Sequence, residues 1–168
     1  LKGFSQSLVA TATSLANVYF WLKSGYFSQN VDELPFLHIW SLSIEEQYYL
    51  VFPFLLLLVF RRFNNHGESV IFGLMVASLV ICLVIERIVL DFGFFFVPAR
   101  AWEFLAGSLI AMRQAAKPDA FGAPRLQNEM LSMLGLILIL VPAFAYSRQT
   151  PYPGQYTLWP VVGSGLIL

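Results

Sequence analysis

The sequence predicts an all-α protein, built as a polytopic bundle of transmembrane helices. Of its 168 residues, 58% are hydrophobic and only 12% are charged, whereas about a quarter of the residues in a typical soluble domain are charged. The apolar residues fall in runs of roughly 15 to 22 residues separated by short polar breaks, and a helix of that length crosses a bilayer. The formal net charge of +0 gives no indication of a nucleic-acid partner.

The apolar runs predict about five full spans and a truncated sixth. In chain order they cover about residues 4–22, 44–60, 69–90, 98–112 and 130–146, and the sixth starts near Trp159. The fourth run is short for a full span. Because the chain opens with Leu1 and ends at Leu168 within an apolar run, we expect it to be an internal piece of a larger membrane protein.

Basic residues in the short loops predict the orientation of the bundle, since Lys and Arg collect on the cytoplasmic side. With the N-terminus inside, that side receives Lys2, Arg61, Arg62, Arg113, Lys117 and Arg125. The segments "WSLSIEEQ", "FFFVPARAWE" and "TPYPGQY" then lie together on the opposite face. The chain is therefore expected to be a multi-pass membrane protein whose polar motifs share one face.

Two adjacent acids, Glu45 and Glu46, stand at the start of the second run. Ser43 and Glu46 fit the capping-box pattern, with Ser at the N-cap and Glu three residues later, so both are predicted to be structural. Glu45 is not needed for that box and shares a helix face with Tyr48 and other aromatic residues. An ionisable group at the membrane boundary is a candidate for function, but from the residues alone capping stays equally open for Glu45.

The segment "PARAWEFLAG" carries the second charged cluster. Arg100 and Glu103 are three residues apart and can meet on one face of a helix. One interpretation is an ion pair that hides two charges near the membrane; the other is an Arg that holds an anionic group while Glu103 orients it. Gly107 continues the same face and is expected to let another helix pack closely.

The remaining candidates for chemistry are few. Cys82 is the single cysteine, so the chain forms no internal disulfide and no cysteine metal site, and it is expected to be a small apolar packing residue. His38 precedes Trp40 and is expected to be a hydrogen-bonded residue rather than a catalytic one. No nucleophile elbow, phosphate-binding loop or metal-ligand spacing occurs, and we expect no metal.

Four segments resemble those of a known family. "LPFLHIWSLSIEEQYYLVFPFLLL" is similar to the hallmark segment of the integral membrane acyltransferase 3 family, the sugar and peptidoglycan O-acyltransferases. "NVYFWLKSGYFSQ", "VPARAWEFLAGSLIA" and "TPYPGQYTLWPVVGSGLIL" resemble, in the same order, three further segments of those proteins. The nearest likeness is to the bacterial O-antigen and peptidoglycan O-acetylases.

The resemblance implies a transfer of an acyl group, usually acetyl, at the bacterial plasma membrane. The expected donor is cytoplasmic acetyl-CoA, no cofactor is bound, and the expected acceptor is a hydroxyl of a cell-surface or exported glycan. The family fold is a bundle of about ten helices. Residues 1–168 would be an internal part of that single domain. The helix that carries the family's catalytic His, and the C-terminal helices, would lie outside the chain, which alone is expected to be inactive.

Residue by residue, the resemblance implies a catalytic part for Glu45 and Arg100. It implies substrate-binding parts for Trp40, Ser41, Gln47, Tyr48 and Glu103. In acyl transfer, a base must take the proton of the acceptor hydroxyl, and donors must face the tetrahedral oxyanion. We expect Glu45 to orient the base or the sugar hydroxyls and Arg100 to hold Glu103 or the developing charge. Trp40 and Tyr48 are expected to form a platform against a sugar ring.

Two other classes of protein fit the same sequence features. A transporter or permease also carries acids within the membrane and helices broken by proline. A purely structural membrane subunit would keep Glu45 and Arg100 only as a helix-start acid and a packed ion pair. A Lys or Arg about ten residues before a His in a preceding helix would separate the acyltransferase from both alternatives.

Overall fold

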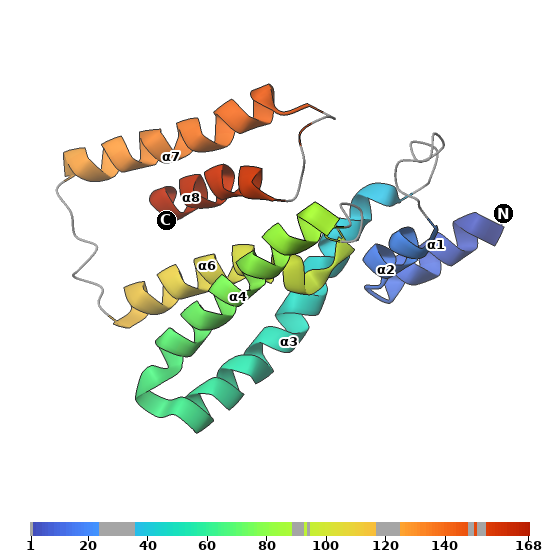
Figure 1. Ribbon diagram of the computed structural model, residues 1–168, viewed down its shortest axis with the longest axis horizontal. Helices are drawn as coiled ribbons and strands as arrows, with labels where there is room; N and C mark the ends of the chain where they lie inside the picture. The colour runs from blue at the N-terminus through green and yellow to red at the C-terminus, as the bar shows by residue number, and fades with distance from the viewer. Residues whose placement is uncertain are drawn as a thin grey trace.

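The computed structural model describes residues 2–23, 36–88, 93, 95–116, 125–147, 150 and 154–168. Within these ranges the chain is helical and contains no strand, which confirms the all-α prediction. The α-helices are α1 (Lys2–Ala12), α2 (Ala16–Lys23), α3 (Trp40–Phe63), α4 (Gly67–Ile88), α6 (Val97–Ala116), α7 (Arg125–Ala145) and α8 (Leu158–Ile167) (Figure 1). The expected loops at residues 24–35 and 117–124, Lys117 included, lie outside the described residues.

Three of the described helices, α3, α4 and α7, are long and apolar enough to cross a membrane. This number is lower than the five full spans expected from the sequence. α6 has 20 residues, but Arg100, Glu103 and Arg113 reduce its apolar character. The described part of α8 has 10 residues, which reach about 15 Å, half of the hydrocarbon core of a bilayer.

The first apolar run is two helices rather than the single span predicted for residues 4–22. α1 has 11 residues and α2 has 8, so neither reaches across a bilayer. The chain turns at Ser14, which takes a positive φ of 58°. Thr13 Oγ1 donates a hydrogen bond to the Val9 carbonyl at 2.9 Å and so closes the end of α1. The Thr13 N–H donates to the same carbonyl at 3.0 Å, and no Gly or Pro marks the break.

The predicted capping box is wrong. α3 begins at Trp40 after a short 3-10 turn, Leu37–Ile39, and its N-cap makes no side-chain hydrogen bond. Ser43 therefore lies inside the helix, where it is buried, and its Oγ accepts a hydrogen bond from the Ala16 N–H at 3.3 Å. The Glu46 carboxylate accepts a hydrogen bond from the Ser14 hydroxyl. Both side chains join α3 to the α1–α2 turn instead of capping their own helix.

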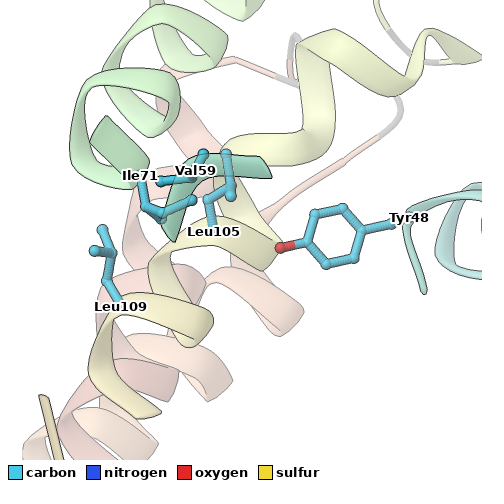
Figure 2. Packing of buried hydrophobic residues seen from close by; sticks show 5 residues of the cluster. All are labelled: Tyr48, Val59, Ile71, Leu105 and Leu109. Carbon is cyan, nitrogen blue, oxygen red and sulfur yellow. The ribbon is translucent and has the colours of Figure 1, made fainter. Parts of the chain in front are cut away.

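α3 and α6 run in the same direction and pack through aromatic side chains. The Tyr48 ring stacks between Phe52 and Phe104, with ring centroids 4.8 and 4.7 Å away. Its hydroxyl hydrogen-bonds with Ser108 Oγ at 3.1 Å. Tyr48 belongs to the largest described core cluster, with Val59, Ile71, Leu105 and Leu109 (Figure 2). This packing sets the position of α6 along the length of α3.

α4 packs antiparallel to α6. The Ser78 hydroxyl on α4 donates to the Pro98 carbonyl and accepts from the Trp102 N–H at 2.9 Å, so it completes the first turn of α6. Glu68 and Arg113 form an ion pair at the opposite end of the two helices. Cys82 is buried among Ala99 and Trp102, as expected of a small packing residue.

Glycines let α7 and α8 approach closely. A Cβ atom added at Gly163 would lie 2.6 Å from the Gly135 carbonyl oxygen, and one added at Gly135 would lie 2.5 Å from the Gly163 carbonyl oxygen. Such a contact was expected at Gly107, and that prediction is wrong for the described residues. A Cβ at Gly107 meets nothing within 4 Å. Among the described helices, the close glycine contact is therefore between α7 and α8.

The helix directions place three of the basic residues expected on the cytoplasmic side at one end of the helices. Arg61 and Arg62 lie in the last turn of α3, and Arg113 lies in the last turn of α6, beside the start of α4. The starts of α3 and α6 lie at the other end, close to the start of α8 (Figure 1). The described residues of the three polar segments expected on one face therefore lie at one end of the helices.

Gly163→Ala is expected to destabilise the protein, because its new methyl group would push the backbones of α7 and α8 apart. We expect a loss of about 1–3 kcal/mol, as in other overpacked interfaces. Gly73→Ala on α4 is the matched control, since a Cβ there meets nothing within 4 Å. It should be neutral or stabilising by up to about 1 kcal/mol. Unfolding of the purified protein in detergent would measure both, and equal effects would contradict the close contact.

Ser78→Ala is expected to loosen the first turn of α6, because the buried Trp102 N–H loses its acceptor. The expected loss is about 1–3 kcal/mol in the free energy of unfolding. Ser164→Ala on α8 removes an exposed hydroxyl that only bonds back to Pro160 in its own helix, so it should change stability by less than about 0.5 kcal/mol. A Ser78 variant as stable as the Ser164 variant would show that α6 does not depend on this hydroxyl.

Candidate functional site

Arg100 and Glu103 form an ion pair at the start of α6, as their spacing predicted. Arg100 Nη2 donates to Glu103 Oε2 at 3.0 Å, and its Nε lies 3.4 Å from Oε1. The two side chains are only 13% and 16% exposed. A charge with so little water around it needs a partner, and the two-point contact holds the plane of the guanidinium in one orientation.

Trp40, in the first motif segment, contacts the Arg100–Glu103 ion pair through Arg100. The Arg100 guanidinium carbon lies 5.2 Å from the centre of the Trp40 ring, which is a cation–π contact. The edge of Trp40 meets Phe95 with ring centroids 5.4 Å apart. The "WSLSIEEQ" and "VPARAWE" segments, 60 residues apart along the chain, therefore share one cluster. Arg100 lies over one face of the Trp40 ring, so that face is not open to a sugar.

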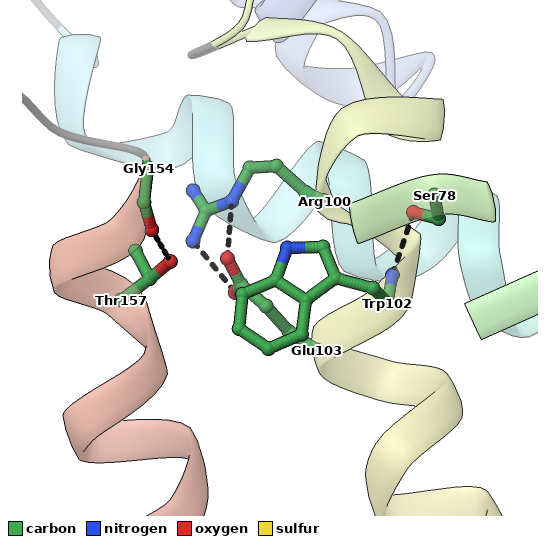
Figure 3. Close-up of polar contacts among 6 residues, drawn as sticks. All are labelled: Ser78, Arg100, Trp102, Glu103, Gly154 and Thr157. Atoms are coloured by element: carbon green, nitrogen blue, oxygen red, sulfur yellow. Dashed lines mark hydrogen bonds and ion pairs between the residues drawn. The ribbon is translucent and has the colours of Figure 1, made fainter. Parts of the chain in front are cut away.

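The third segment borders the same end of α6. Leu158 and Val161 of α8 pack against Ala99 and Trp102. Immediately before α8, the buried Thr157 hydroxyl donates to the Gly154 carbonyl (Figure 3). Figure 3 shows Arg100 and Glu103 projecting from α6 on the side where this turn lies. The Trp102 Nε1–H is buried and has no acceptor among the described residues.

Glu45 and Ser41 lie in the first two turns of α3, and both are half-buried. Neither side chain makes a hydrogen bond or ion pair with any part of the chain that the structure describes. Arg100 is thus paired with Glu103 and not with Glu45. The Glu45 carboxylate keeps its accepting capacity at the end of the bundle where Trp40 and Arg100 meet, so it is available to a substrate or to another part of the protein.

Tyr48 and Gln47 serve the packing of α3 in ways that the sequence did not reveal. Both faces of the Tyr48 ring are covered by phenylalanines, so Tyr48 is a core residue and offers no face to a sugar. Gln47 Nε2 donates to the Ser14 carbonyl at 2.6 Å and to Asn17 Oδ1 at 2.9 Å. Asn17 was missed because it lies 30 residues before Gln47 in the chain. The two side chains meet only because the chain turns at Ser14, and the sequence gives no signal for that turn.

The cluster offers groups suited to acyl or anion chemistry. Arg100 has five N–H donors, and only Nε and Nη2 are used by Glu103, which leaves donors for a developing negative charge. Glu45 supplies a carboxylate that can accept from a hydroxyl or an imidazole N–H. Among the described residues, no three His, Cys, Asp or Glu side chains gather as metal ligands.

Comparison with known proteins gives relatives but no matching family model. The chain is 29% identical over 164 residues to an uncharacterized protein of Haemophilus influenzae, covering 92% of this chain and 66% of that protein. It is 27% identical over 155 residues to the putative membrane-bound transacylase BcsY of Komagataeibacter xylinus, covering 92% of this chain and 38% of the relative.

A third relative is the O-acetyltransferase OatA of Staphylococcus aureus. The identity is 32% over 107 residues, which covers 58% of this chain and 18% of the relative. No solved structure matches. The chain therefore spans less than two thirds of the length of these relatives, from 18% to 66%. It is similar to proteins named as a membrane-bound transacylase and an O-acetyltransferase, which supports an acyltransferase-like membrane protein.

Proposed function

We propose that the protein is part of a membrane O-acyltransferase, which moves an acyl group, acetyl in the simplest case, from acyl-CoA to a hydroxyl of a glycan. The observation that carries this proposal is the meeting of Trp40, Arg100 and Glu103, because it joins two motif segments around one shielded positive charge. The likeness to a transacylase and an O-acetyltransferase supports the same reaction class.

The reaction asks for three things from the protein. The acceptor hydroxyl oxygen attacks the thioester carbon, the carbonyl becomes an oxyanion, and the C–S bond then breaks so that CoA leaves as its thiol with the proton taken from the hydroxyl. A base must take that proton, donors must face the oxyanion, and the hydroxyl must be held in line. A cationic group that is already oriented before the reaction stabilises the oxyanion most effectively.

The residues of this chain divide these tasks as follows. Arg100 faces the oxyanion with the N–H groups that Glu103 leaves unused, and Glu103 keeps the guanidinium in place. Glu45 accepts a hydrogen bond from the acceptor hydroxyl or from the base. The base itself is a histidine from another part of the protein, as the family resemblance implies. Trp40 shields the positive charge from water on one face.

The location follows from the same proposal. Acyl-CoA is a cytoplasmic donor, so the enzyme sits in the bacterial plasma membrane as a multi-pass protein with a glycan exported or built on the other side. The end of the bundle with Arg61, Arg62 and Arg113 faces the cytoplasm, since basic residues favour that side. The Trp40–Arg100 end then faces the glycan, and the proposal requires the thioester end of acyl-CoA to enter the bundle from the cytoplasmic side and reach Arg100.

Glu45→Gln in the full-length parent protein is expected to lower acyl transfer by about 10²–10⁴-fold, since a neutral amide loses the charge that orients the hydroxyl or the base. The measurement is ester-linked acetate on the cell-surface glycan, with the level of membrane protein checked by blot. Glu46→Gln is the matched control, because its side chain serves only the Ser14 hydroxyl among described residues and glutamine can still accept that bond. It should change transfer by less than about threefold.

The outcomes of this experiment separate the alternatives. Wild-type acetate in the Glu45 variant would show that Glu45 is an acid at a helix start, outside the chemistry. Equal losses in both variants, at equal protein level, would assign the effect to the α3 start as a whole. If the wild-type protein itself adds no acyl ester to any glycan, the acyltransferase proposal fails and a transporter becomes the better explanation of intramembrane acids.

A further inference from the structure

A pocket that the acyltransferase proposal does not use lies between α2, α3 and the start of α6. Its volume is about 410 Å³, and its wall includes Asn17, Trp21, Gln47, Phe95 and Pro98. This volume is within the range of about 300–1,000 Å³ of small-molecule sites. Phe95 lines this pocket and also contacts Trp40, so the pocket adjoins the cluster described above.

The amide groups in this pocket have a determined orientation. Asn17 is 2% exposed, and its Nδ2 donates to the Phe95 carbonyl at 3.1 Å. A carbonyl oxygen can only accept, so the Asn17 Oδ1 must point the other way, toward Gln47 Nε2 at 2.9 Å. Gln47 Nε2 also donates to the Ser14 carbonyl, another pure acceptor. The two acceptors at the ends of this chain of bonds allow only this assignment of the amide atoms.

One polar atom is left over. Both Gln47 Nε2–H groups are used, whereas Gln47 Oε1 has no partner among the described residues. Apart from Asn17, the rest of the wall is apolar or aromatic, with Trp21, Phe95 and Phe96 as its largest side chains. A group that fits such a pocket has an apolar face and a hydrogen-bond donor for the Gln47 oxygen. A hydroxylated sugar ring has both, since its C–H face packs on aromatic rings.

We propose that this pocket binds one sugar-sized, hydroxyl-bearing ring of the acceptor and that Gln47 Oε1 accepts a hydrogen bond from one of its hydroxyls. The inference rests on the proposed acyltransferase function and names the place of the acceptor. The acyl group of the donor is excluded as the occupant by its chemistry, because a thioester offers only an acceptor to an oxygen that also only accepts. Gln47 is then the binding residue, and Asn17 and the α1–α2 turn position its amide.

The test measures binding rather than transfer, in the full-length parent protein in lipid nanodiscs. Ligand-observed NMR would follow three probes: methyl β-D-glucoside, its per-O-methylated analogue and S-ethyl thioacetate, a thioester with no hydrogen-bond donor. Val18→Phe fills the pocket without touching the amide bonds, since Val18 lines the pocket and is 41% exposed. Val84→Phe makes the same change at a 49% exposed position on α4, away from the pocket, and is the matched control.

The proposal expects the glucoside to bind wild type and the Val84 variant equally, and the Val18 variant at least about tenfold more weakly. The per-O-methylated probe, which has no donor, should bind wild type about tenfold more weakly than the glucoside, a comparison that needs no variant to fold. A glucoside that does not bind wild type, or that binds the Val18 variant as well as wild type, would overturn the proposal. Selective loss of the thioester probe in the Val18 variant would overturn it in favour of an acyl pocket.

The binding result and the transfer result can fail separately. Glucoside binding that depends on Val18, in a protein that transfers no acyl group, would leave a sugar site and reject the acyltransferase. Acyl transfer that depends on Glu45, without any glucoside binding at this pocket, would leave the enzyme and reject the acceptor site proposed here.

Discussion

The parallel packing of α3 on α6 is the constraint on which the candidate site depends. The stacked rings of Phe52, Tyr48 and Phe104, with the Tyr48–Ser108 hydrogen bond, set the relative height of the two helices. At that height, Trp40 lies against the Arg100 guanidinium.

Arg100 is only 13% exposed, and a charge in that setting is tolerated because Glu103 neutralises it. The same packing leaves Glu45 half-buried without a partner among the described residues, which is costly for stability and useful for chemistry.

Features that depend on near neighbours in the chain could be predicted from the sequence. The apolar runs that became α3, α4 and α7 were found because their length and composition alone indicate membrane helices. The Arg100–Glu103 pair was predicted because residues three apart share a helix face. Cys82 was correctly expected to pack. The order of the motif segments along the chain also led to the acyltransferase-like class that the relatives support.

Features that depend on distant parts of the chain could not be predicted in this way. Ser43 looked like an N-cap, but a 3-10 turn starts α3 earlier and the α1–α2 turn takes the hydroxyl instead. The break at Ser14 has no Gly or Pro to signal it. Gly107 and Gly163 look alike in sequence, yet only Gly163 meets another backbone. The pairing of Gln47 with Asn17, and with it the proposed acceptor pocket, exists only because α2 folds back on α3.

A double-mutant cycle on Trp40 and Arg100 would test most directly whether the two motif segments form one functional site. The single variants Trp40→Leu and Arg100→Lys and the double variant would be compared with wild type in the rate of acyl transfer to glycan by the full-length protein, at equal membrane levels. Because the guanidinium lies on the indole ring, the account predicts that the two losses are not additive and differ from their sum by at least about 0.5 kcal/mol. Additive losses, as found for distant and independent positions, would contradict a shared site at the starts of α3 and α6.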